Sequence, residues 1–214
     1  MGNLGKIVLI GFGLLVLMVL MYKSNPPSEQ PKSALDKKTS LIAGTRYPKN
    51  KMLGSFQLTS QLNQNFNEQN LKGKWHIIFM GFTHCPHICP TEMQILKTVY
   101  EKLSPSLQKK LQIVFVSTDP LRDTPQQLKQ YLSRYHNDFI GLTGTKRQIE
   151  GFSKQFGMPF MPSNETDKNK SYEVSHSASY YLTNPKAQLE AVFSTPHVLE
   201  NIYTDIFNIL KASQ

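Results

Sequence analysis

The chain has little cysteine: Cys85 and Cys89 are its only two among 214 residues. Because they lie four positions apart, no disulfide framework joins distant segments, and their role is local. Acidic residues are also few, 15 Asp and Glu against 24 Lys and Arg, which leaves a formal charge of +9. The lysines are scattered, however, and the sequence lacks zinc-finger spacing and an aromatic RNA-binding signature. We therefore expect no nucleic-acid partner.

Internal repeats are absent, and the composition is not extreme in any class. Hydrophobic residues make up 39% of the chain, with 12 Phe and 9 Tyr, and Gly and Pro are moderate. This composition excludes a wholly disordered chain, a collagen-like chain and a polytopic membrane protein. The length suits one ordinary globular domain with an appendage.

One long apolar run, IVLIGFGLLVLMVLMY, lies near the amino terminus. At about 1.5 Å per residue it gives roughly 24 Å of helix, a little less than the ~30 Å hydrocarbon core, and snorkelling Lys6 and Lys23 can extend it. A cleaved signal peptide is the alternative, but no small-x-small site follows, and no cysteine is there to accept a lipid. We predict an uncleaved membrane anchor over 1–23, a flexible tether over 24–51 and a globular domain over 52–214.

Strand–loop–helix patterns predict the fold of the globular part. Two apolar runs are each followed by a helical pattern: WHIIFMGF by PTEMQILKTVYEKL, and LQIVFVSTD by TPQQLKQYLSRYH, where Thr124 is a good N-cap and Pro125 suits the first helical position. The other expected elements are a hairpin over 55–66, a strand over 139–144, a helix over 145–156, a polar loop over 157–171, strands over 177–183 and 188–195, and a helix from about Pro196. This order predicts an α/β fold, a thioredoxin-like mixed sheet with helices on both faces.

The segment GFTHCPHICP places Cys85 and Cys89 in the loop that enters a helix, at the carboxyl end of a strand. Spacing of i and i+4 lets both thiols lie on one helix face, and we expect nearby backbone N–H groups to favour the thiolate. Two thiols are too few for structural zinc, whereas cuprous copper accepts fewer, softer ligands. Buried cysteines that act as small hydrophobic residues are the alternative.

Three histidines are candidates for the same site. His84 and His87 adjoin the cysteines, where they can bind a metal, tune a thiol or lie exposed in the loop. His176 precedes a predicted strand after a polar loop, a position from which its side chain can reach the thiols. His76 and His136 are assigned ordinary surface or core positions, and His197 beside Pro196 suits a helix start.

With these residues the sequence resembles the SCO/SenC family, copper chaperones for cytochrome c oxidase assembly. GFTHCPHICP resembles the copper-site motif of that family, and VSTDPLRDTP and VSHSASYYLTNP match two later blocks in the same order. The resemblance implies a thioredoxin-like domain outside the membrane, in the periplasm or the mitochondrial intermembrane space, on a single-pass inner-membrane anchor. It implies one copper ion, Cu(I) or Cu(II), bound by Cys85, Cys89 and His176, with Asp119 in support.

The chain departs from the family pattern at two of these positions. His87 stands where members usually carry Asp between the cysteines, which replaces a carboxylate by an imidazole. Asn184 stands where Asp usually precedes Pro, and we expect this change to affect only a turn.

Three functions follow from these residues. The first is a metallochaperone, not an enzyme in the turnover sense, that passes copper from an upstream donor to the oxidase subunit with the binuclear CuA site. The second is a thiol-disulfide oxidoreductase that reduces the cysteines of the same oxidase subunit or of another exported protein. In this alternative Cys85 and Cys89 are redox thiols able to form a disulfide, and His176 is dispensable. The third, a peroxidase of the peroxiredoxin kind, leaves the paired cysteines and His176 unexplained.

Overall fold

The computed structural model describes residues 40–157, 160–161 and 175–213. Over these residues, no helix combines the length and the apolar character that a bilayer crossing needs. The predicted anchor over 1–23 and most of the predicted tether lie outside the described residues.

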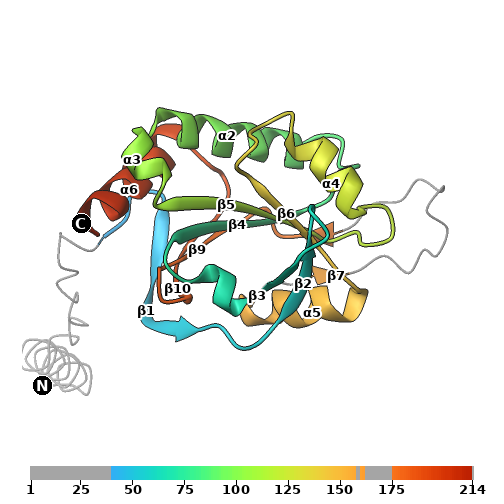
Figure 1. Ribbon diagram of the computed structural model, residues 1–214. Helices are drawn as coiled ribbons and strands as arrows, with labels where there is room; N and C mark the ends of the chain where they lie inside the picture. Colours follow the sequence, from blue (N-terminus) through green and yellow to red (C-terminus); the bar gives the residue numbers. More distant parts are fainter. Residues whose placement is uncertain (1–39, 158–159, 162–174, 214) are drawn as a thin grey trace, which may run out of the picture. The chain divides into compact units, whose positions relative to one another are not determined.

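An eight-stranded mixed sheet forms the centre of the domain (Figure 1). Its spatial order is β1-β10-β9-β4-β5-β6-β2-β3, and β4, β5 and β6 are mutually parallel while the other pairs are antiparallel. The strands are β1 (Gly44–Met52), β2 (Gln57–Ser60), β3 (Asn65–Asn67), β4 (Trp75–Gly81), β5 (Leu111–Ser117), β6 (Ile140–Thr143), β9 (Tyr180–Thr183) and β10 (Gln188–Phe193). A separate antiparallel pair consists of β7 (Phe160–Met161) and β8 (Ser175–His176).

The central position of β4 follows from its sequence. Every residue of WHIIFMG is buried, as expected of a strand whose two faces are both covered. By contrast, β10 alternates between buried and partly exposed residues, as expected of a strand with one face less covered. The antiparallel pair β9–β10 and the hairpin β2–β3 at the sheet edge confirm the corresponding predictions.

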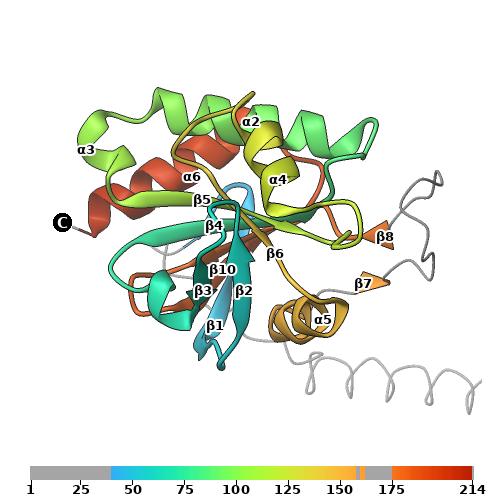
Figure 2. The ribbon, with the colours of Figure 1, turned by 45° about the vertical axis from the view of Figure 1, so that its right-hand side comes forward.

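Helices cover both faces of the sheet (Figure 2). One apolar core lies between the sheet and the helices α2 (Ile88–Lys102), α3 (Pro105–Gln108), α4 (Pro125–Leu132) and α6 (Leu199–Ala212). A second core lies on the opposite face, beneath α5 (Lys146–Gln155) and the short 3₁₀ helix η1 (Glu68–Leu71). This arrangement confirms the predicted mixed sheet flanked by helices.

Local capping explains where two helices begin. The Thr124 hydroxyl accepts a hydrogen bond from the Gln127 N–H, with Pro125 at the first helical position of α4. Thr145 and Gln148 form a reciprocal capping box at the start of α5. Two predicted boundaries are corrected: α4 ends at Leu132 rather than near residue 136, and α6 begins at Leu199 rather than near Pro196.

Strand β1 corrects the predicted tether. Residues 44–52 pair with β10, although the sequence analysis assigned 24–51 to a flexible segment. The polar sequence GTRYPKNKM has no period-two apolar pattern, so its strand character is not visible locally. Tertiary contacts supply the missing stabilisation: the buried Asp205 carboxylate in α6 accepts the backbone N–H groups of Ile42, Ala43 and Gly44 at 2.8, 2.8 and 3.2 Å.

Candidate metal centre

The two cysteines meet at the carboxyl end of β4, where the loop after Gly81 enters α2. Cys85 is half-buried in this loop, and Cys89, in the first turn of α2, is fully buried. The Cys89 N–H donates a hydrogen bond to Cys85 Sγ at 3.4 Å, and neither cysteine is in a disulfide. The four-residue spacing thus places Cys85 in the loop that enters α2, with its sulfur atom against the backbone of the first helical turn.

The environment of Cys89 is tightly packed. A Cβ atom added to Gly81 would lie 2.8 Å from Cys89 Sγ and 2.9 Å from Cε2 of Phe115. Burial raises the pKa of the Cys89 thiol well above its ordinary range, and the negative charges of Cys85 and Asp123 act in the same direction. The expectation that the helix N-terminus favours a thiolate is therefore wrong for Cys89, because the cost of burying its charge is larger.

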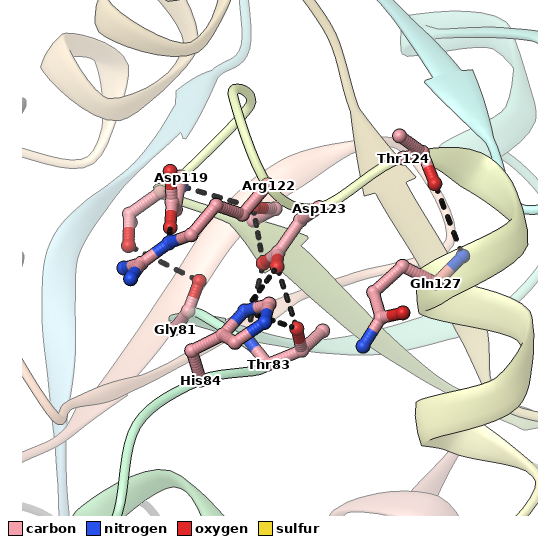
Figure 3. Close-up of polar contacts among 10 residues, drawn as sticks. Gly81, Thr83, His84, Asp119, Arg122, Asp123, Thr124 and Gln127 are labelled. Atoms are coloured by element: carbon pink, nitrogen blue, oxygen red, sulfur yellow. Dashed lines mark hydrogen bonds and ion pairs between the residues drawn. The ribbon is translucent and has the colours of Figure 1, made fainter. Parts of the chain in front are cut away.

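A buried carboxylate, Asp123, organises the loop beside the cysteines (Figure 3). Its Oδ2 accepts the Thr83 N–H at 3.0 Å and the Ser117 hydroxyl at 2.7 Å, while Oδ1 accepts the Thr83 hydroxyl at 2.6 Å. Burial raises the pKa of Asp123, and the hydrogen bonds from Thr83 and Ser117 partly oppose this shift. Asp123 thereby ties the loop after β5 to the residue two positions before Cys85.

Asp119, which the sequence analysis placed in a supporting role, is buried in the same loop and is ion-paired with Arg122. One ligand atom each of His84, Asp119 and Asp123 lies within 4.8 Å of the others. Both carboxylates nevertheless already have partners, since Asp119 binds a guanidinium and Asp123 accepts three hydrogen bonds. A cation at this position would compete with those contacts, so we assign these three residues a structural role in stabilising the loop after β5.

The two histidines of the cysteine loop are both exposed. His84 Nδ1 lies 3.1 Å from the Thr83 hydroxyl and 3.6 Å from Asp123 Oδ1, and Figure 3 shows its ring directed toward that carboxylate. His87 occupies the N-cap of α2, and its side chain makes no capping hydrogen bond. His84 therefore contacts the loop network, whereas His87 faces solvent.

His176 belongs to β8, where its backbone pairs with Phe160 of β7. Its side chain lies outside the described part of the structure. The next strand, β9, begins four residues later at Tyr180, which is directly opposite Phe79 of β4. Because Phe79 is two residues from the end of β4, the start of β9 lies at the same sheet end as the cysteine loop.

Sequence reasoning missed a buried cluster that connects these two segments. Glu92 in α2 contacts Tyr180 in β9 and His197 in the segment before α6. His197 was assigned a helix start, but its side chain is only 1% exposed. One local signal could have indicated this cluster: Glu92 is a charged residue on the face of α2 that also carries Cys89 and Met93 and is buried.

Comparisons with known proteins establish the family. A sequence model of the SCO1/SenC family matches residues 44–211. A putative copper-binding protein of Stutzerimonas stutzeri is 40% identical over 163 residues, which cover 76% of this chain and 79% of that protein. The mitochondrial protein SCO1 of Saccharomyces cerevisiae is 36% identical over 157 residues, 73% of this chain and 53% of that protein. The chain belongs to the SCO1/SenC family, and it spans about half the length of several mitochondrial relatives.

Solved structures agree with this assignment. The copper-bound crystal structure of yeast Sco1 has a TM-score of 0.70 at 33% identity, over 76% of this chain and 90% of that one. Copper-bound ScoI of Arabidopsis thaliana has a TM-score of 0.65 at 32% identity, over 74% of this chain and 98% of that one. The thioredoxin-like arrangement is therefore shared with relatives whose structures contain copper.

Proposed function

We propose that this protein is a copper metallochaperone that holds one copper ion through Cys85, Cys89 and His176. The observation that carries the proposal is the contact between the two cysteines at the start of α2, where the backbone N–H of Cys89 in the first helical turn donates a hydrogen bond to Sγ of Cys85 in the preceding loop. Thiolates and an imidazole suit copper, and Cu(I) in particular accepts a small number of soft ligands. The copper-bound relatives support the same choice of metal.

The half-buried position of Cys85 suits ligand exchange better than a fully enclosed site. An incoming thiol can reach Cys85, while Cys89, which is buried, is the ligand on the side of the ion that faces the protein core. Because burial favours the neutral Cys89 thiol, loading of copper releases a proton, and loading should therefore become weaker in acid. In this arrangement copper is cargo: it passes from the sulfur ligands of this protein to those of the recipient, and no covalent bond of the protein chain changes.

The recipient we propose is the cytochrome c oxidase subunit that carries the CuA site. Membership in the SCO1/SenC family supports this recipient. The apolar run over 7–22 supports a membrane anchor, and membership in the family supports a globular domain on the periplasmic or intermembrane-space side.

The test uses full-length protein, reduced and then loaded with Cu(I) or Cu(II). We expect one copper per chain, a thiolate-to-Cu(II) charge-transfer band, and transfer of copper to an apo CuA domain. Cys85→Ser and His176→Ala should each lose tight binding, whereas His87→Ala, which changes an exposed imidazole of the same loop, should retain it. Equal binding by the His176 and His87 variants would contradict the proposed ligands.

A second candidate function is thiol-disulfide reduction, which the pairing of an accessible cysteine with a buried one favours. In that reaction the two thiols reduce a disulfide of the target protein and become a disulfide themselves, and an external thiol then reduces them again. His176 has no part in this exchange. A His176→Ala variant that loses copper but reduces a CuA-domain disulfide at the wild-type rate would show that both activities are present.

A further inference from the structure

Glu92, Tyr180 and His197 form a buried polar cluster outside the cysteine loop that has no role in the proposed chemistry. Tyr180 is 0% exposed, the Glu92 residue is 8% exposed and the His197 side chain is 1% exposed. Each comes from a different part of the fold: α2, the start of β9 and the segment before α6. Burying such groups is costly unless they satisfy one another, so their contacts determine how these three segments fit together.

Glu92 is the common partner of the cluster. The Tyr180 hydroxyl donates to the Glu92 backbone carbonyl at 3.1 Å and to its Oε2. His197 Nδ1 lies 2.7 Å from the same Oε2, and His197 Nε2 donates to the Phe193 carbonyl oxygen at 3.0 Å. Burial is the largest single influence on the pKa of His197 and lowers it, but the hydrogen bonds to Glu92 and to the Phe193 carbonyl, together with the charge of Glu92, outweigh burial and leave the pKa raised. The contact between His197 and Glu92 is thus a buried, charge-assisted hydrogen bond.

The imidazole also limits the position of Tyr180. The two rings are stacked, with centroids 4.0 Å apart and planes within 12° of parallel. Tyr180 also makes an edge-to-face contact with Phe79 of β4, at 5.6 Å between centroids. Tyr180 is therefore held by a hydrogen bond at its hydroxyl and by contacts with two aromatic rings, which leaves the start of β9 little freedom to move relative to α2.

Both ends of this contact lie close in sequence to the proposed copper ligands. Glu92 is three residues after Cys89, on the same face of α2. Tyr180 is four residues after His176, and the intervening segment is held by a local turn in which the Ser179 N–H donates to the Ser177 hydroxyl at 3.2 Å. The path from Cys89 to His176 thus runs through one helical turn, the Glu92–Tyr180 contact and a short, hydrogen-bonded segment.

We infer that Glu92, Tyr180 and His197 form a positioning cluster for copper: it fixes the segment that carries His176 against the helix turn that carries Cys89. The inference rests on the proposed function, because it takes Cys89 and His176 as ligands of the same ion. None of the three residues binds the metal. Their effect is to hold the backbone that leads from β9 to His176 in place before copper arrives, which reduces the cost of ordering the site.

The decisive variant is Tyr180→Phe in the full-length protein, since it removes one hydroxyl and keeps the ring. The matched control is Tyr100→Phe, because Tyr100 is also buried, also packs edge-on against a phenylalanine, and donates to a carboxylate, Asp138 Oδ2, at 3.2 Å. Tyr100 lies near the far end of α2 from Cys89. Glu92→Gln is the second variant, which keeps an oxygen acceptor but removes the charge.

Three readouts apply to each variant: Cu(I) affinity by competition with a chelator, the thiolate-to-Cu(II) absorption band with its paramagnetic resonance spectrum, and the denaturant midpoint. We expect Tyr180→Phe to weaken copper binding about tenfold and to shift both Cu(II) spectra. Glu92→Gln should give a smaller change in the same direction. Tyr100→Phe should keep wild-type spectra and affinity even where its denaturant midpoint falls by as much as that of Tyr180→Phe.

Wild-type spectra and affinity in Tyr180→Phe would overturn the inference while leaving the chaperone function in place. Equal losses in Tyr180→Phe and Tyr100→Phe would also overturn it, because the effect would then follow general stability. No stoichiometric copper on the wild-type chain would overturn the proposed function, and this inference with it.

Discussion

Replacement of Gly81 by alanine tests how closely β4 approaches the buried cysteine. The new Cβ would lie 2.8 Å from Cys89 Sγ and 2.9 Å from Phe115 Cε2, whereas ordinary contacts begin at 3.4 Å. At least one neighbour must therefore move by about 0.6 Å. Cys89 and Phe115 are both fully buried, so neither can move into open space. We expect Gly81→Ala to lower the free energy of unfolding by about 1–3 kcal/mol, as overpacking of a core typically does.

The same displacement should also weaken copper binding, because the sulfur that moves belongs to a proposed ligand. Urea unfolding followed by circular dichroism gives the stability change, and chelator competition gives the copper affinity. Gly151→Ala is the matched control: Gly151 lies exposed in α5 with no heavy atom within 4 Å of the new Cβ, so this variant should gain up to about 1 kcal/mol. A Gly81→Ala protein with wild-type stability and copper affinity would refute the packing argument.

His76 and His197 should make the free energy of unfolding depend on pH in opposite directions. A separate variant, Asp205→Ala, tests how β1 is attached. Burial lowers the pKa of His76 from 6.5 to about 4, so the folded state binds fewer protons than the unfolded state between these values. Stability should fall by roughly 3 kcal/mol from pH 6.5 to 4, and His76→Gln should remove this part of the dependence in urea titrations. The pKa of His197 is raised in the folded state, so the stability that His197 contributes should be fully present below about pH 6.5 and should disappear as the pH rises through the folded-state pKa. An NMR titration that gives His197 a pKa below 6.5 would contradict this prediction. Asp205→Ala leaves three backbone N–H groups without their acceptor and should cost about 2–4 kcal/mol, measured by urea unfolding, with faster amide hydrogen exchange at residues 42–44.

Much of the fold was predictable because its central elements have strong local patterns. The apolar run over 75–82, the Thr124–Pro125 helix start and the capping residue Thr145 each indicate one element without reference to the rest of the chain. Strand β1 was not predictable in this way. Its residues are polar, and what holds them is pairing with a strand about 140 residues later, together with the distant carboxylate of Asp205.

The site was predictable where its residues are adjacent in sequence. The spacing of Cys85 and Cys89 indicates that the two residues are neighbours where the loop enters α2, and the Cys89 N–H contacts Cys85 Sγ there. Burial of Cys89 was not visible from the spacing, and it reverses the expected effect of the helix N-terminus on its pKa. The cluster around Glu92 could not be found either, since its residues are separated by 88 and 105 positions and meet only after the sheet forms.

The measurement that tests the central claim most directly is X-ray absorption at the copper edge on Cu(I)-loaded full-length protein and its His176→Ala variant. If Cys85, Cys89 and His176 hold the ion, the wild-type spectrum should fit two sulfur atoms and one nitrogen atom per copper, and the nitrogen contribution should be lost in the variant. A spectrum that keeps its nitrogen in His176→Ala, or that shows only sulfur in the wild-type protein, would contradict the three-ligand site.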